Sequence, residues 1–137
     1  MNSNKFITRR FIAGAIDYTV ILVLTYIYLQ IIGEVSPDGT YSVTGWKTVP
    51  VLLFWLMYLC LVEVTLDSTL GNYIAGLQAV DLVTEENLTF KQSFLRHSVD
   101  YLDMMFCGIV AVIIIKNSRE SQRLGDLLAK TKVVRRR

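Results

Sequence analysis

A run of apolar residues from Phe11 to Ile32 constrains the fold of this chain more than any other feature. Only Asp17 and a few uncharged polar residues interrupt it, and it exceeds the roughly 20 apolar residues that span a bilayer. An aspartate inside such a helix costs about 2.5–3.5 kcal/mol on insertion scales, so it requires a compensating partner. Arg10 is the nearest candidate, because a separation of seven residues places it on the same helix face. The run therefore predicts a membrane helix that does more than anchor the chain.

Two further apolar runs extend this prediction to the whole chain. Hydrophobic residues make up 53% of the sequence and charged residues 19%, and the mean hydropathy is +0.42, which is typical of integral membrane proteins. The 137 residues are expected to form a single domain. We predict an all-α fold with apolar helices at about 11–32, 49–66 and 94–115, a polar loop at 67–93 and a basic tail at 116–137.

The polar loop contains signals for short structural elements. Ser68 or Thr69 is expected to cap a short helix that ends near Gly76. From Leu77 to Phe90 the sequence mixes polar and apolar residues, with β-branched residues around a polar turn. This pattern predicts a small hairpin outside the membrane.

Charged residues in or beside the apolar runs are the candidate functional residues. Glu63 lies near the end of the second run, where it either reaches the headgroup region or lies beside the charges of the first span. Arg96 and Asp103 repeat the seven-residue spacing of the first pair. Each arginine is therefore a candidate partner for the aspartate of the other segment, with coincidence as the alternative.

The third apolar run leaves two topologies open. Three full spans would place the chain ends on opposite sides, with the tail in the cytoplasm by the positive-inside rule. The N-terminal segment, however, is also short and basic. If the third run bends near Gly108 and re-enters, both ends are cytoplasmic, and residues 131–134 can pair as a strand with residues 77–83. We favour this second topology.

Patterns typical of catalysis or metal binding are absent from the sequence. Cys60 and Cys107 lie in apolar runs and are expected to be packing residues. His97 has no Cys or His neighbour with which to form a ligand set. The chain also lacks a nucleophile–base motif and a phosphate-binding glycine loop. We expect no enzymatic activity, no cofactor and no nucleic-acid partner, and the residues do not indicate whether a metal binds.

Four groups of residues follow one another in a particular order and spacing. They are Arg10 with Asp17, Thr69-Leu70-Gly71 with Gly76, Arg96, and Gly125-Asp126 with Ala129, Thr131 and Val133-Val134. In this respect the chain resembles the RDD family of small membrane proteins, named for an arginine and two aspartates. The resemblance implies that Arg10, Asp17 and Asp126 are those three residues, although Asp126 could also simply cap the turn at 127–130. It further implies transport of an unspecified ligand.

The chain departs from the family pattern in one place. Where the family usually has Gly-x-Thr-x-Gly-Lys, this sequence has Asp67 for the first glycine and Asn72 for the lysine. The chain therefore lacks a positive charge that would lie at the membrane surface.

Two functional hypotheses fit these residues. In the first, the protein is a transporter or an ion or proton pathway component, in which carboxylates bind the ion and arginines act as counter-charges. Because two or three helices cannot enclose a path, this hypothesis requires a homo-oligomer or a partner membrane subunit. In the second, the protein is structural or accessory, and its Arg–Asp pairs fix helix packing. The candidate residues are Arg10, Asp17, Glu63, Arg96, Asp103, Arg123 and Asp126.

The location and lipid contacts follow from the same features. We expect a multi-pass protein of the cell membrane, most simply the bacterial cytoplasmic membrane. Residues 135–137 are three consecutive arginines at the end of the tail. Such a cluster is typical of a segment that contacts anionic lipid headgroups.

Overall fold

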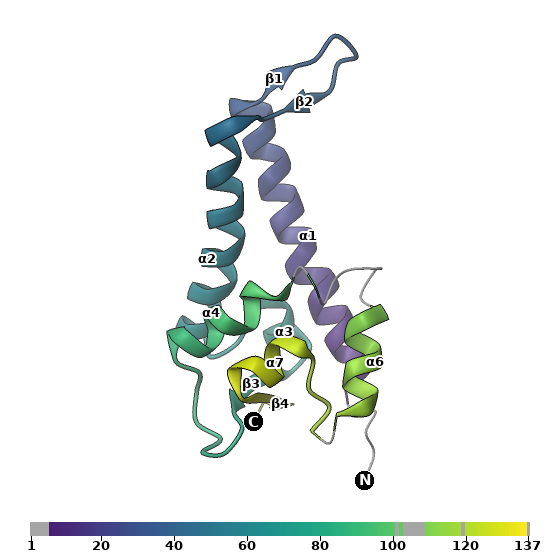
Figure 1. Cartoon of the computed structure of the whole chain (residues 1–137), viewed down its shortest axis with the longest axis vertical. Coiled ribbons are helices and arrows are strands. Elements are labelled where there is room, and N and C mark those ends of the chain that lie inside the picture. The colour runs from purple at the N-terminus through teal and green to yellow at the C-terminus, as the bar shows by residue number, and fades with distance from the viewer. Residues whose placement is uncertain (1–5, 101, 103–108, 119, 137) are drawn as a thin grey trace.

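The computed structural model describes residues 6–100, 102, 109–118 and 120–136. Two long helices, α1 (Ile7–Ile32) and α2 (Val49–Thr65), run side by side and are joined at one end by a short hairpin (Figure 1). The other elements gather at the opposite end of the helix pair, around the start of α1 (Figure 1). We call this group of elements the basal layer. It consists of α3 (Leu70–Ile74), β3 (Leu77–Asp81), α4 (Phe90–Ser98), α6 (Ile109–Asn117), α7 (Leu124–Ala129) and β4 (Thr131–Arg135).

The two long helices expose most of their apolar surface. Only 17% of the most apolar stretch of each helix is buried, and Leu22 and Ile31 on α1 are 67% and 73% exposed. A helix in the core of a soluble protein would bury these side chains, whereas a bilayer solvates them. Both helices are long enough to cross a membrane. The first two predicted spans are therefore confirmed as candidate membrane helices.

The bounds of these helices differ slightly from the prediction. The first helix starts at Ile7 rather than at residue 11, so Arg10 lies within it. A single turn of 3-10 helix, η1 (Gly45–Thr48), precedes α2. Between the long helices, β1 (Glu34–Val35) pairs antiparallel with β2 (Tyr41–Ser42) across the turn that the Pro-Asp-Gly sequence predicts.

The predicted third helix at 94–115 is not one continuous helix. The first part, α4, ends at Ser98, and α6 begins at Ile109. Both helices lie in the basal layer rather than beside the far end of α1 and α2 (Figure 1). Asp103 and the bend expected near Gly108 lie outside the described residues. Among the residues that the structure describes, only α1 and α2 with its preceding turn are candidate spans.

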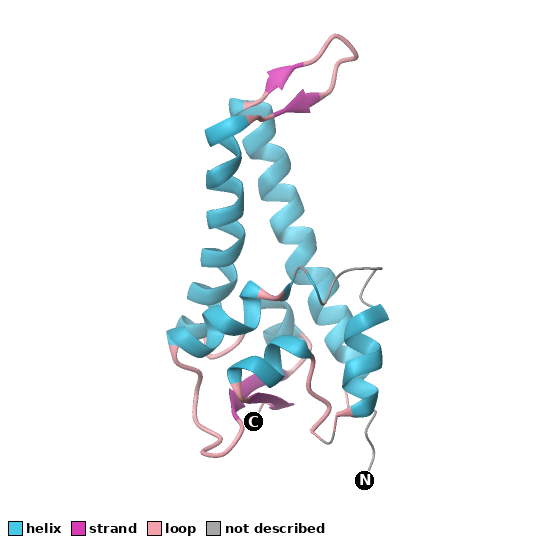
Figure 2. Cartoon of the chain, in the orientation of Figure 1, coloured by secondary structure: helices cyan, strands magenta, loops and turns pink. Residues whose placement is uncertain are grey.

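The strands of the basal layer come from distant parts of the chain. β3 pairs antiparallel with β4, with Leu77 opposite Arg135 and Asp81 opposite Thr131 (Figure 2). The predicted pairing of residues 131–134 with residues 77–83 is confirmed. The hairpin predicted within 77–90 is not confirmed: β3 is followed by a turn, and the pairing across it is one isolated antiparallel bridge between Val80 and Asn87, with a backbone bond from Asp81 N to Glu86 O at 3.0 Å.

Both ends of the described chain lie in or beside the basal layer. Arg9 Nη1 near the start of α1 donates to the carbonyl oxygen of Ala75 at 3.4 Å, and Arg10 donates to the carbonyl oxygen of Ser121. The start of α1 and the strand β4 lie at the same end of the molecule (Figure 1). This placement agrees with the topology in which both ends lie on one side of the membrane.

Candidate functional site

Asp17, in the first half of α1, holds the start of α3 against α1 through hydrogen bonds. Its side chain is 6% exposed, and its two oxygens accept hydrogen bonds at 2.7 Å from Thr69 Oγ1 and from the backbone N–H of Gly71. Thr69 is also the N-cap of α3 and accepts a bond from Asn72 N at 3.3 Å. The predicted cap at this position is thereby confirmed. Asp17 is compensated by the start of a short helix, where backbone N–H groups lack helical partners.

Gly71 makes this contact sterically possible. A Cβ atom at this position would lie 1.9 Å from the carbonyl oxygen of Ala13 on α1. No side chain fits at that distance without movement of the backbone. The glycine therefore allows α3 to approach α1 closely enough for its N–H to reach Asp17.

Arg10 does not compensate Asp17, which corrects the sequence prediction. Seven residues correspond to about 10.5 Å along a helix axis, so the two side chains share a face but reach different neighbours. Arg10 is bound by α7 and the turn before it: its guanidinium donates to Asp126 Oδ2 and to the carbonyl oxygen of Ser121.

Asp126 is the common partner of two arginines. It is completely buried, and its Oδ1 lies 3.0 Å from Arg96 Nη1 while its Oδ2 pairs with Arg10. Burial alone would raise the pKa of Asp126. The charges of Arg96, Arg10 and Arg123 outweigh burial and hold this pKa well below its usual range. Asp126 Oδ2 also accepts the backbone N–H of Arg123 at 3.0 Å. Asp126 therefore helps to cap the start of α7 from within the helix, rather than capping the turn at 127–130 as the alternative prediction had it.

Arg96 links α4 to α2 and α7. It is 1% exposed, and its Nη2 lies 3.4 Å from Glu63 Oε1. Glu63 is itself 1% exposed, and its direct ionic partners lie on α4 rather than on α1. That it lies at the depth of the headgroups stays a prediction. The expectation that Arg96 serves Asp17 is also wrong. Gly125 explains the close approach of α7, because a Cβ atom there would lie 2.4 Å from the carbonyl oxygen of Arg96.

His97 completes the site, although the sequence analysis considered it only as a metal ligand. Its Nδ1 lies 2.6 Å from Asp100 Oδ2 and its Nε2 lies 3.1 Å from Glu63 Oε2. Burial lowers the pKa of His97, but the two carboxylates, with Asp100 first, raise it to a net value above the ordinary one. Asp100 is held in turn by Arg123, whose Nη2 lies 3.1 Å from Asp100 Oδ1. Ser93 donates to Glu63 Oε2 at 2.6 Å.

A sequence signal for this part of the site exists: four polar residues are spaced as on one face of a helix. Ser93, Arg96, His97 and Asp100 follow one another at intervals of three, one and three, so they fall on one face of a helix. We call the connected ionic residues the charge network. Its members are Arg10, Glu63, Arg96, His97, Asp100, Arg123 and Asp126.

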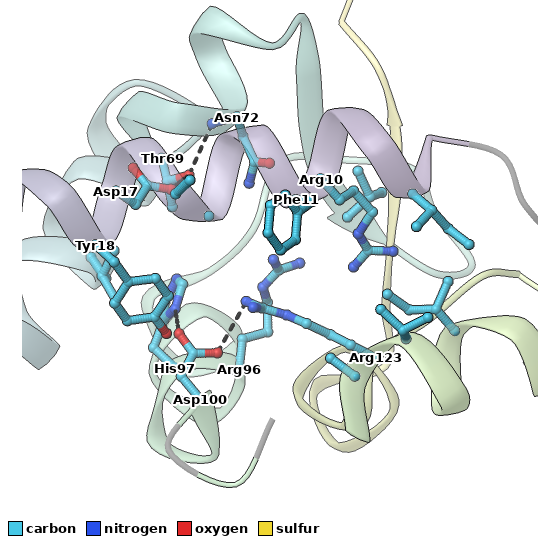
Figure 3. Close-up of a pocket in the computed structure, with 18 residues that line it drawn as sticks. Arg10, Phe11, Asp17, Tyr18, Thr69, Asn72, Arg96, His97, Asp100 and Arg123 are labelled. Atoms are coloured by element: carbon cyan, nitrogen blue, oxygen red, sulfur yellow. Dashed lines mark hydrogen bonds and ion pairs between the residues drawn. The ribbon is translucent and has the colours of Figure 1, made fainter. Parts of the chain in front are cut away.

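A cavity of about 310 Å³ adjoins the charge network. Arg10, Arg96 and Arg123 extend toward its centre from different parts of the chain, and Asp17, His97 and Asp100 line its sides (Figure 3). Its apolar wall comes mainly from α1 and α6. The structure thus brings most of the predicted charged residues to one cavity, and adds His97 and Asp100 to them. Glu63 and Asp126, which pair with these arginines, are not among the lining residues.

The remaining predicted site residues have structural positions or lie outside the description. Gly76 has a φ of +68° at the turn that leads into β3, which favours glycine. Asp103 and Cys107 lie outside the described residues, and Cys60 is fully buried. Among the described residues, no group of three or more His, Cys, Asp and Glu side chains is placed to hold a metal ion.

Comparison with known proteins gives one match. The model of the RDD family matches residues 5–130 of the chain. No curated protein and no solved structure matches it.

Proposed function

The chain belongs to the RDD family, whose model covers nearly all of its residues, and on this basis we propose that it is a transporter or an ion or proton pathway component of the cell membrane. The observation that carries this proposal is the cavity beside the charge network. Ionisable side chains at membrane depth are costly and usually mark a pathway or a ligand site when they face a cavity. Here three arginines, two aspartates and one histidine line a single cavity at one end of the two apolar helices.

The transport proposal includes assembly into an oligomer. Two helices that expose most of their apolar surface cannot enclose a path across a bilayer. The path would therefore run between copies of this chain, or between it and a partner membrane subunit. The cavity would then be one binding site on that path. It lies at the end of the helix pair where both chain ends lie.

A structural or accessory role is the second candidate, and the hydrogen bonding of Asp17 favours it. Both oxygens of this carboxylate are bonded within the protein. Asp126 likewise joins α1, α4 and α7. A buried network of this kind can fix the arrangement of helices without binding a ligand.

The other parts of the proposal concern location and contacts. We propose a multi-pass protein of the bacterial cytoplasmic membrane, without enzymatic activity or nucleic-acid partner. The cluster of arginines at residues 135–137 would contact anionic lipid headgroups.

Ion and proton flux in liposomes distinguishes the two candidates. Purified wild type is compared with Asp17→Asn, in which the amide oxygen can still accept from Gly71 N and the amide N–H can donate to Thr69 Oγ1. Because this variant keeps both contacts and removes only the charge, it should fold. Protein-dependent flux that disappears in Asp17→Asn supports transport.

The matched control is Asp38→Asn, in the exposed hairpin between the long helices. This variant should retain the wild-type flux. If wild type and both variants give equally tight liposomes while remaining folded, the transport proposal is rejected and the structural role is retained.

A further inference from the structure

The balance of charge around the cavity favours an anionic ligand. Three arginines and two carboxylates line it, which gives a formal charge of +1 before any protonation of His97. The carboxylates that hold Arg10 and Arg96, namely Asp126 and Glu63, lie outside the lining. Of the direct counter-charges of the three arginines, those of Arg10 and Arg96 are therefore outside the lining, whereas Asp100, which pairs with Arg123, is part of it.

The hydrogen bonding of the lining residues points the same way. Each oxygen of Asp17 already accepts a bond, and each oxygen of Asp100 is paired, one with His97 and one with Arg123. These carboxylates offer little to a cation. Arg96 Nε is buried and has no hydrogen-bond partner within the described residues; Asp100 Oδ1 has no hydrogen bond there either, although it lies 3.1 Å from Arg123 Nη2. A guanidinium N–H group is a preferred donor to phosphate and carboxylate oxygens.

The lining of the cavity also contains apolar residues. They include Phe11 and Ala15 on α1 and Ala111, Val112 and Ile115 on α6. A volume of about 310 Å³ is at the lower limit of small-molecule sites. It accommodates a charged group and several carbon atoms rather than a whole lipid.

We propose that the cavity binds an oxyanion attached to an apolar body, that is, a phosphate or carboxylate group with an alkyl or aryl substituent. Its source is either an anionic phospholipid, whose chains would remain in the bilayer beside α1 and α6, or a soluble amphipathic acid. The proposal rests on the proposed function in that it names the ligand class of the same site.

The first test measures binding of two chemically matched probes to the full chain in a neutral detergent. Octyl phosphate carries the expected anionic group, and octyltrimethylammonium carries the same chain on a cation. Isothermal titration calorimetry should show saturable binding of octyl phosphate and weaker binding, or none, of the ammonium probe. Equal or tighter binding of the ammonium probe would overturn the proposal.

Two variants locate the binding. At Gly14, which lines the cavity, an added Cβ atom meets nothing within 4 Å, so Gly14→Leu fills the cavity without a clash at the backbone. Arg123→Gln removes the most exposed of the three guanidinium groups. Each should weaken octyl phosphate binding by about tenfold or more, which is the usual effect of losing a charge-assisted contact.

Matched controls separate a local effect from a general one. Thr19→Leu places the same side chain on an exposed position of α1, and Arg135→Gln removes an exposed arginine outside the cavity. Both should bind octyl phosphate as wild type does. If Gly14→Leu remains folded and binds with the wild-type affinity, the ligand is elsewhere and the proposal fails.

Native mass spectrometry then identifies the source of the anion. Protein released from nanodiscs should retain phosphatidylglycerol but not phosphatidylcholine if the ligand is a lipid, and Gly14→Leu should lose that retention. Octyl phosphate binding without lipid retention assigns the site to a soluble acid. Flux without octyl phosphate binding would refute the ligand class inferred here and leave the transport proposal in place. Octyl phosphate binding without flux would support the ligand class and reject the transport proposal.

Discussion

At the scale of single residues, Gly71 determines how closely α3 approaches α1. Its missing side chain lets its N–H reach Asp17 at 2.7 Å, and any Cβ atom would collide with the carbonyl oxygen of Ala13. Gly14, on the same helix as Asp17, has the opposite character, because an added Cβ atom there is unhindered. The two glycines therefore form a natural pair for substitution by alanine.

We predict that Gly71→Ala destabilises the protein and that Gly14→Ala does not. In the first variant the new methyl group displaces α3 and weakens the bond to Asp17, at a cost of about 1–3 kcal/mol for overpacking, or more if the buried carboxylate loses its partner. In the second, alanine gains up to about 1 kcal/mol of helix propensity. Thermal unfolding in detergent measures both. Similar melting temperatures for the two variants would show that the Gly71 contact is not important for the fold.

His97 gives the protein a predicted pH dependence with a defined sign. The folded state raises the pKa of His97 above its ordinary value of 6.5, so folding and protonation favour each other. The stabilisation is complete below pH 6.5 and is lost as pH rises through the folded-state pKa. Asp126 has a lowered pKa, and its contribution is lost only at strongly acidic pH.

The melting temperature should therefore fall between pH 6 and pH 9, and His97→Gln should reduce this slope. The groups that face His97 are Glu63 and Asp100. Differential scanning fluorimetry at matched ionic strength measures the slope. If the melting temperature of the wild type rises between pH 6 and pH 9, the predicted direction of the pH dependence is wrong.

Single-residue reasoning from the sequence identified the ionic residues better than their partners. Arg10, Asp17 and Asp126 were recognisable because charges are rare next to apolar runs, and because of the family resemblance. Helical spacing, however, reports which residues share a face and not which element packs against that face. The partners of Asp17 depend on the path of the chain after α2, more than 50 residues away. Local periodicity carries no information on such a contact.

At the scale of elements, hydropathy located α1 and α2 well but misjudged the third apolar region. The start of that region is α4, whose polar face packs into the basal layer and whose apolar side chains, such as Phe90 and Phe94, are exposed. Averaged hydropathy does not separate an amphipathic helix from the apolar residues that follow it. The pairing of β3 with β4 was predictable only through the assumption that both segments lie on the same side.

Cross-strand cysteines provide a test of this pairing. Ala79 lies directly opposite Val133 in the β3–β4 register, so their side chains point to the same face of the sheet. In a background without native cysteines, the Ala79→Cys/Val133→Cys variant should form a disulfide under mild oxidation. Peptide mapping by mass spectrometry after thiol alkylation detects the bond.

The control for this test shifts one cysteine by a single position. In Ala79→Cys/Lys132→Cys the second side chain points to the other face, and the bond should form much less readily. Efficient cross-linking in the control, with none in the first variant, would show that the register is displaced by one residue.

At the scale of the whole molecule, the arrangement of charge agrees with a two-span topology. The chain contains 14 lysine and arginine residues, and only Lys47 lies between the two long helices. The other 13 lie either within the first ten residues of the chain or after α2. Arg10 on α1 also pairs with Asp126 on α7, which requires the first turns of α1 and the basal layer to be on one side. The positive-inside rule assigns that side to the cytoplasm.

We therefore predict that the start of α1 and the turn before β4 are cytoplasmic, and that the β1–β2 hairpin is on the opposite side. Single-cysteine variants Thr8→Cys, Lys130→Cys and Asp38→Cys place a thiol at an exposed position in each segment. A membrane-impermeant maleimide applied to intact cells should label only Asp38→Cys, and in inverted vesicles the other two. Labelling of all three from the reverse sides would preserve the two-span fold but reject the cytoplasmic assignment. If Thr8→Cys and Lys130→Cys were labelled from opposite sides, the ion pair between Arg10 and Asp126 could not exist in the membrane. In that case the charge network described above would not form in the membrane, and the arrangement of the site that depends on it would be rejected.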